Sequence, residues 1–124
     1  MKSIDENPVR KKSFEFAKRI IRLHDYLRKR NCPNTLLKQL IRSGTSIGAN
    51  IEEAIAAQTQ KEFANRLMIA RKEAREAMYW LQLIHETDFL SVKEFKSISA
   101  DCSEILRLLT AIIKTLCTRT MESN

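Results

Sequence analysis

The sequence Arg42-Ser43-Gly44-Thr45-Ser46-Ile47-Gly48-Ala49-Asn50-Ile51-Glu52-Glu53-Ala54 contains both glycines of the chain. Glycine costs about 1 kcal/mol relative to alanine inside a helix, so a segment with two glycines usually interrupts one. Here the apolar spacing of the preceding residues continues through Ile47 and Ile51, which is typical of an uninterrupted helix. Gly44 and Gly48 lie one turn apart on the same side of that helix. The stretch therefore predicts a helix with a close helix–helix contact at its two glycines.

The composition of the whole chain is that of an all-helical protein. Its 124 residues suffice for one domain with a hydrophobic core, and two glycines and two prolines leave little material for tight turns. No apolar run is long enough to span a membrane, and no apolar segment follows the N-terminus as in a signal peptide. The odd set of cysteines, without CxxC spacing, favours free thiols in a reducing compartment. We therefore expect a single cytoplasmic domain, residues 1–124.

Helical periodicity predicts four helices joined by short loops. The first starts at Pro8 after an Asn7 cap, or later at Ser13, and ends near residue 30. The second runs over about residues 35–57, the third lies between a polar turn at 58–60 and a break at 86–90, and the fourth follows. Residues 1–8 are expected to be a loose arm and residues 118–124 a frayed tail. Helices of this length and short loops predict an antiparallel, up-down-up-down four-helix bundle.

Capping residues support these boundaries. Asn34 is the expected N-cap of the second helix and Thr59 that of the third, while Ser91 and Glu94 form a capping box for the fourth.

Two regular apolar seams define the expected core of the second half of the chain. The third helix contributes Phe63, Leu67, Ala70, Ala74, Ala77, Leu81 and Ile84. The fourth helix contributes Phe95, Ile98, Cys102, Ile105, Leu109, Ile112 and Leu116. The alanines make the third helix thin, which suits close approach of the Gly44 and Gly48 segment. Apolar residues outside the seams, such as Ile21 and Met68, predict an exposed apolar face and self-association.

Positive charge is concentrated at the N-terminal end of the chain. The net charge is +7, of which residues 1–30 carry +6. A phosphate-binding face on the first helix is predicted from its cations, Lys11, Lys12, Lys18, Arg19, Arg22 and Lys29. A second group comprises Arg71, Lys72 and Arg75. No aromatic residue interleaves the first-helix set on its own face, so binding is expected to be backbone-directed and salt-sensitive. The alternative is a solvated charged face.

A polar stripe lies beside the glycines. Ser46, Asn50 and Glu53 align at helical spacing. We interpret the stripe as a structural polar network between helices or subunits, joined by Arg66 and by Glu73 of the third helix. A binding or catalytic cluster is the alternative.

The sequence carries no pattern of a known catalytic centre. A di-metal carboxylate bundle requires Glu-x-x-His pairs, but Ile21 stands three residues before His24, and Gln82 three residues before His85. No histidine lies near a cysteine in sequence, and no glycine-rich phosphate loop occurs. We therefore expect no enzymatic activity, no metal and no cofactor.

The residues from Gln39 to Ala54 resemble the signature of the 23S ribosomal RNA intervening-sequence protein family, whose core reads Ser-Ile-x-x-Asn-Ile-x-Glu. The similarity continues over about residues 14–116, through Phe63, Leu67, Ile69-Ala70, Glu73-Ala74, Glu76 and Tyr79-Trp80-Leu81. Many members have proline at the position of Gly48 and glycine at that of Ala54. The resemblance implies a small bacterial four-helix bundle that forms a ring-like homopentamer. It also implies a relative, the accessory protein of diversity-generating retroelements, a basic pentameric barrel that binds nucleic acid and a reverse transcriptase.

Two functions follow from the charge and the resemblance together. The first is a non-enzymatic oligomeric scaffold that binds RNA or DNA through backbone-directed basic contacts. The second is a protein-interaction adaptor that holds a partner polypeptide, such as a reverse transcriptase, with no direct nucleic-acid role.

Overall fold

The computed structural model describes residues 6–123, with side chains to residue 119, and contains four α-helices and no strand in this part of the chain. The helices are α1 (Pro8–Lys29), α2 (Asn34–Ile55), α3 (Gln60–Glu86) and α4 (Val92–Ser123). The all-helical prediction is confirmed. Of the predicted N-terminal arm, residues 1–5 lie outside the described residues, whereas Pro8 already belongs to α1. The polar residues from Thr118, predicted to be a frayed tail, continue α4 as helix to Ser123.

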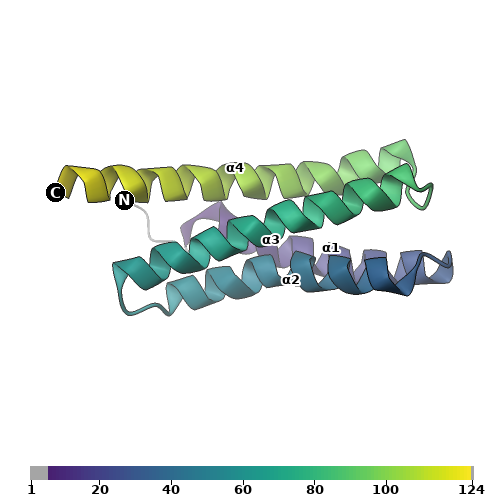
Figure 1. Cartoon of the computed structure of the whole chain (residues 1–124), viewed down its shortest axis with the longest axis horizontal. Coiled ribbons are helices and arrows are strands. Elements are labelled where there is room, and N and C mark those ends of the chain that lie inside the picture. The colour runs from purple at the N-terminus through teal and green to yellow at the C-terminus, as the bar shows by residue number, and fades with distance from the viewer. Residues whose placement is uncertain (1–5, 124) are drawn as a thin grey trace.

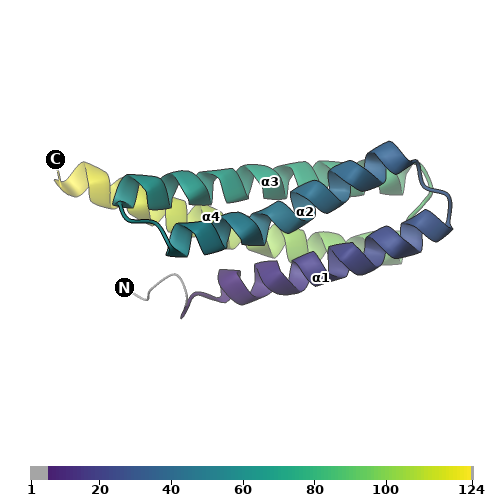
Figure 2. The same cartoon turned by 90° about the horizontal axis from the view of Figure 1, so that it is seen from below.

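The four helices share one elongated core. The chain turns back at each of its three loops, so consecutive helices lie alongside one another in both views (Figure 1 and Figure 2). Among neighbouring helices, α2 and α3 pack most extensively and α1 and α4 least. The last turns of α4 extend past the ends of the other helices. The boundary between α1 and α4 is therefore the most open side of the molecule.

The helix starts follow local capping chemistry. The Asn7 side chain accepts a hydrogen bond from the Val9 backbone N–H at 2.9 Å, which selects the earlier of the two expected starts of α1. Thr59 Oγ1 likewise accepts from the Glu62 N–H at 3.0 Å. These caps satisfy amide groups that would otherwise have no partner in the first turn.

The expected Asn34 cap of α2 is wrong. Asn34 is the first residue of the helix, and the cap position belongs to Pro33, without a side-chain hydrogen bond. The carbonyl of Pro33 accepts hydrogen bonds from the N–H groups of Leu36 and Leu37, at 3.1 and 3.2 Å. The helical bonding pattern thus begins one residue earlier than the side-chain preference of asparagine indicates.

The capping box at the start of α4 is confirmed. The Glu94 N–H donates to Ser91 Oγ at 3.1 Å, and the Ser91 N–H donates to Glu94 Oε1 at 2.8 Å. Tyr26 of α1 donates its hydroxyl hydrogen to Glu94 Oε2 at 2.6 Å. The backbone hydrogen bond from Ser91 and then that from Tyr26 lower the pKa of the Glu94 carboxyl group.

Replacing Glu94 with glutamine is expected to lower the free energy of unfolding by about 0.5–1 kcal/mol at neutral pH. The pKa of Glu94 is lower in the folded state than in the unfolded state. Its carboxylate therefore stabilises the fold at pH values above the unfolded-state pKa, and this stabilisation is lost as the pH falls through the folded-state pKa. Urea unfolding at pH 7 and pH 3 measures the effect, which should shrink at pH 3. Glu53→Gln, an exposed charge with no partner among the described residues, is the control. An equal Glu94→Gln effect at both pH values would show that its charge does not matter.

The apolar seams form the core with one shift. On α3 every predicted seam residue is buried, except Phe63, which is partly buried. On α4 the predicted seam residues Phe95 and Ile112 are only partly buried, and Ile113 is buried more deeply than Ile112. An α-helix has 3.6 residues per turn, and a seam of period 3.5 therefore drifts around a straight helix by about 20° per heptad. Of the residues outside the seams, Ile21 and Met68 are exposed.

The close contact at the glycines exists, but its partner is α1 and not α3. A Cβ atom on Gly44 would lie 2.8 Å from Cγ1 of Ile20, and one on Gly48 would lie 3.4 Å from Oγ of Ser13. On the thin face of α3, Ala74 contacts α4, where the Cys102 thiol donates to the Ala74 carbonyl oxygen at 3.3 Å. Small residues thus occur at two separate helix–helix contacts, and their sequence pattern does not indicate which helices pair.

Within the part of the chain that the structure describes, no helix has a stretch that is both long enough and apolar enough to cross a membrane.

Candidate nucleic-acid interface

The predicted cations of α1 lie on its solvent side, because the opposite side contributes Phe16 and Ile20 to the core. Most of them are held by carboxylates. The ion pairs are Lys12–Glu104 at 2.9 Å, Lys18–Glu15 at 2.9 Å, Arg19–Asp101 at 2.5 Å and Lys29–Asp25 at 3.1 Å. Arg28 also contacts Asp25. Arg28 and Lys29 together lower the pKa of the Asp25 carboxyl group. The basic face of α1 is therefore partly neutralised.

These ion pairs leave the cations available to a stronger anion. The paired side chains of Lys12 and Lys18 remain 42% and 40% exposed. Exposed pairs of this kind contribute about 0–1 kcal/mol each, so a phosphate group can replace the carboxylate at small cost. Lys11 and Arg22 have no ion pair among the described residues. Within the predicted set, the positive charges of Lys11 and Arg22 are therefore the ones least neutralised by nearby carboxylates.

The sequence-based prediction missed the carboxylates of α4 that approach α1. Asp101 and Glu104 lie three residues apart and contact Arg19 and Lys12. Their spacing places both on one helical face, and this was a detectable signal. Which helix that face would meet was not detectable, because it depends on the packing of the bundle.

A groove of about 500 Å³ lies between α1 and α4, which pack less extensively than any other pair of neighbouring helices. Leu23, Leu90 and Ile98 form its apolar lining. Arg22 of α1 and Lys93 of α4 also line it, and both are exposed without an ion pair among the described residues. An exposed cation from each of the two helices therefore lines this groove.

A second groove, of about 480 Å³, lies between α2 and α3. Lys72 and Arg75, from the second basic group predicted from the sequence, line it together with Tyr79 and Trp80. Tyr79 is 58% exposed, and its ring lies 5.1 Å from that of Trp80 in an edge-on arrangement. This second surface thus combines cations with aromatic rings.

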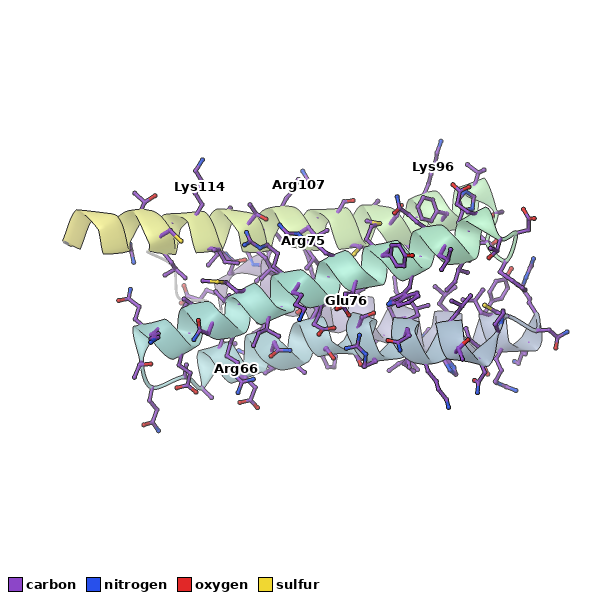
Figure 3. All side chains as sticks on the ribbon, in the orientation of Figure 1. Arg66, Arg75, Glu76, Lys96, Arg107 and Lys114 are labelled. Atoms are coloured by element: carbon purple, nitrogen blue, oxygen red, sulfur yellow. The ribbon has the colours of Figure 1, made fainter. Side chains whose placement is uncertain are left out.

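The predicted polar stripe separates into two clusters. In the first, Arg42 of α2 donates from Nη1 to Glu73 Oε2 at 3.1 Å and from Nη2 to Glu76 Oε2 at 2.6 Å. The bond to Glu76 is the main cause of the raised pKa of Arg42. Figure 3 shows Glu76 on the side of α3 that faces α2. This cluster ties α2 to α3.

The second cluster contains the asparagine of the stripe. Arg66 Nη1 donates to Asn50 Oδ1 at 3.4 Å, and Asn50 Nδ2 donates to the Ser46 carbonyl oxygen at 2.8 Å. Ser46 donates its hydroxyl hydrogen to the Arg42 carbonyl oxygen within its own helix. Glu53 is exposed and has no partner among the described residues. The structure therefore joins Asn50 to Arg66, and Arg42 to Glu73, but among the described residues neither the Ser46 nor the Glu53 side chain forms a hydrogen bond or ion pair to another helix.

Two of the three thiols are buried. Burial raises the pKa of the Cys102 thiol to about 12 and also raises that of Cys32, so both thiols stay protonated at neutral pH. His85 lies with Nδ1 2.8 Å from the Leu90 carbonyl oxygen. No group of three or more potential metal ligands occurs among the described residues.

The fold and the surface define a class: a small all-helical protein with a polar network between helices and exposed basic faces. The sequence model of the 23S rRNA-intervening sequence protein family matches residues 5–111, and the chain belongs to this family. The structure is similar to the crystal structure of a protein of unknown function from the S23 ribosomal protein family of Bacteroides thetaiotaomicron. The two are 47% identical, with a TM-score of 0.83 over 86% of this chain and 95% of that one. A search of curated proteins found no match.

Proposed function

We propose that this protein is a non-enzymatic, cytoplasmic scaffold that binds the phosphate backbone of RNA or DNA. In this proposal the chain is an antiparallel, up-down-up-down bundle that assembles into a homo-oligomer, the pentamer that the family resemblance implies. One observation carries the binding role. The net charge is +7, and cations including Lys11, Arg22 and Lys93 are exposed without an acidic partner among the described residues. Such a field attracts polyanions.

The name of the family, which refers to ribosomal RNA, supports an RNA-related role. Exposed apolar side chains support self-association. Phe14 and Ile21, one heptad apart on α1, are 64% and 53% exposed, an arrangement that a second copy of the chain would cover.

Charge reversal on α1 tests the binding role. The double variant Lys18→Glu and Arg22→Glu is expected to abolish binding of RNA and DNA, because it replaces two attractive contacts with repulsive ones. Binding is measured over a salt series, with the oligomer mass determined by light scattering in the same buffers. The matched control is Lys38→Glu with Lys61→Glu, which reverses two exposed cations on α2 and α3. Absence of binding by the unaltered protein at low salt would refute the proposal.

A protein-interaction adaptor is the second candidate. It is favoured by exposed apolar residues on the outer side of α3, Met68, Ile69 and Tyr79, which are 41%, 39% and 58% exposed. A partner polypeptide, such as a reverse transcriptase, would then co-purify with the protein. That association should be insensitive to the Lys18→Glu and Arg22→Glu changes, whereas nucleic-acid binding is sensitive to them.

A further inference from the structure

Charge is segregated between two sides of α4. All three acidic residues among its described side chains point toward α1 or the start of the helix: Glu94 bonds to Ser91 and Tyr26, Asp101 to Arg19, and Glu104 to Lys12. The opposite side carries Lys96, Arg107 and Lys114, each exposed and without an ion pair among the described residues. The packing of α4 on α1 therefore removes negative charge from its solvent side.

The three cations form a straight row. They are spaced by eleven and seven residues, or about three and two turns, so they share one face of the helix. Figure 3 shows all three projecting from the same edge of α4, away from the other helices. At 1.5 Å per residue the row is about 27 Å long. This length corresponds to about eight base pairs at 3.4 Å each.

The residues between these cations allow a close approach. Ala100, Ser103, Thr110 and Ala111 are small and exposed. No large apolar side chain is exposed from Lys96 to Lys114, so this described segment lacks the anchor that an interfacial membrane helix needs. It also lacks an aromatic ring on which an unpaired base could stack. A row of charges without stacking groups suits the backbone of a double helix better than a single strand.

The neighbouring helix extends the surface. The contact of Cys102 with Ala74 sets α3 beside the first half of α4. Arg75, the residue after Ala74, lies at this level, and Figure 3 shows it between α3 and α4, although its side chain also borders the groove toward α2. It has no ion pair among the described residues.

We propose that the outer face of α4, formed by Lys96, Arg107 and Lys114, is a docking surface for the phosphate backbone of double-helical nucleic acid. The inference rests on the proposed function and adds which face binds and what form of nucleic acid it takes. The α4 cations contribute more than those of α1, because the nearby carboxylates cancel part of the positive charge of most α1 cations.

Neutral substitution of the row tests the inference. The triple variant Lys96→Gln, Arg107→Gln and Lys114→Gln is compared with Lys12→Gln, Lys18→Gln and Lys29→Gln on α1, and with a distant control, Lys38→Gln with Lys61→Gln. All eight residues are exposed or half-buried, each triple variant removes three positive charges and the control removes two, so the fold should persist, as checked by circular dichroism. The probes are an RNA duplex of about 20 base pairs, a single strand of the same length and poly-L-glutamate.

The α4 triple variant is expected to bind the duplex about tenfold or more weakly at about 0.1 M salt, with the slope of log affinity against log salt reduced by about two to three. The α1 triple variant should lose less, and the distant control should change affinity less than about twofold. The single strand should bind more weakly than the duplex.

Other outcomes separate the failure of this inference from that of the proposed function. If the α4 variant binds like the distant control while Lys18→Glu with Arg22→Glu abolishes binding, the α4 face is wrong and the nucleic-acid scaffold stands. If the unaltered protein binds neither the duplex nor the single strand, both the α4 docking surface and the nucleic-acid scaffold are refuted. Equal or tighter binding of the single strand overturns the assignment to a double helix. Competition by poly-L-glutamate at equal charge concentration would reassign the surface to an acidic polypeptide.

Discussion

Replacing Gly44 with leucine is expected to lower the free energy of unfolding by about 3 kcal/mol, near the upper end of overpacking effects. Even a Cβ atom at this position would lie 2.8 Å from Cγ1 and 2.9 Å from Cγ2 of Ile20. Ile20 is fully buried and branched at Cβ, so its side chain has no free rotamer into which it could move. The helices α1 and α2 would have to separate. Urea unfolding followed by circular dichroism measures the loss.

The second glycine gives the matched control. A Cβ atom on Gly48 would lie 3.4 Å from Ser13 Oγ, close to an ordinary contact. Gly48→Ala should therefore be neutral or stabilising, since alanine gains about 1 kcal/mol of helix propensity over glycine. In a double-mutant cycle, Ile20→Ala should relieve part of the Gly44→Ala cost, because it removes Cγ1 and Cγ2, the two nearest carbons, and leaves only Cβ at 3.2 Å. Unchanged stability of Gly44→Leu would show that α1 does not approach α2 this closely.

The second large effect is expected at Phe16, where substitution by alanine should cost about 3–5 kcal/mol. Phe16 is only 1% exposed and belongs to the core shared by the four helices. Truncation would leave a cavity on α1, the helix whose packing on α4 is the least extensive. Chemical denaturation at a fixed protein concentration measures the change, so that any stabilisation by self-association is constant.

Phe14 provides the comparison, with the same side chain two residues earlier. It is 64% exposed, and Lys18 Nζ lies 5.5 Å from the centre of its ring, so the expectation that no aromatic residue lies among the α1 cations on their own face is wrong. Phe14→Ala should change the free energy of unfolding of the isolated chain by no more than about 0.5 kcal/mol. It should reduce the mass measured by light scattering if α1 contributes its exposed apolar residues to self-association. A large stability loss without a change in mass would contradict the assignment of Phe14 to an outer surface.

The local features of the fold were predictable from sequence. Asn7, Thr59 and Ser91 cap helices as expected, since a cap and the amide group it bonds lie within three residues of each other. The seam of α3 was predictable for a similar reason: a regular spacing of apolar residues defines which side of a helix is buried. Asn34 is the exception, because the neighbouring Pro33 begins α2 through its carbonyl group.

The candidate interface was predictable only in part. The concentration of cations on the exposed side of α1 follows from residue spacing, as the structure shows for Lys18 and Arg22. The neutralisation of Lys12 and Arg19 could not be predicted from residue spacing, because their partners Glu104 and Asp101 are more than eighty residues away in the chain. The cations of α4 were likewise present in the sequence, but their importance depends on the acids of the same helix facing α1.

The sequence by itself thus determined the four helices, most of their ends and the side of each that is buried. These properties depend on interactions within a few residues, which periodicity and capping record directly. Only the tertiary structure decided that Gly44 packs on Ile20 of α1, that Ala74 of α3 contacts Cys102 of α4, and which cations lack an acidic partner among the described residues. A helical pattern states that a face is buried or charged, but the identity of the opposing face depends on how distant segments pack together.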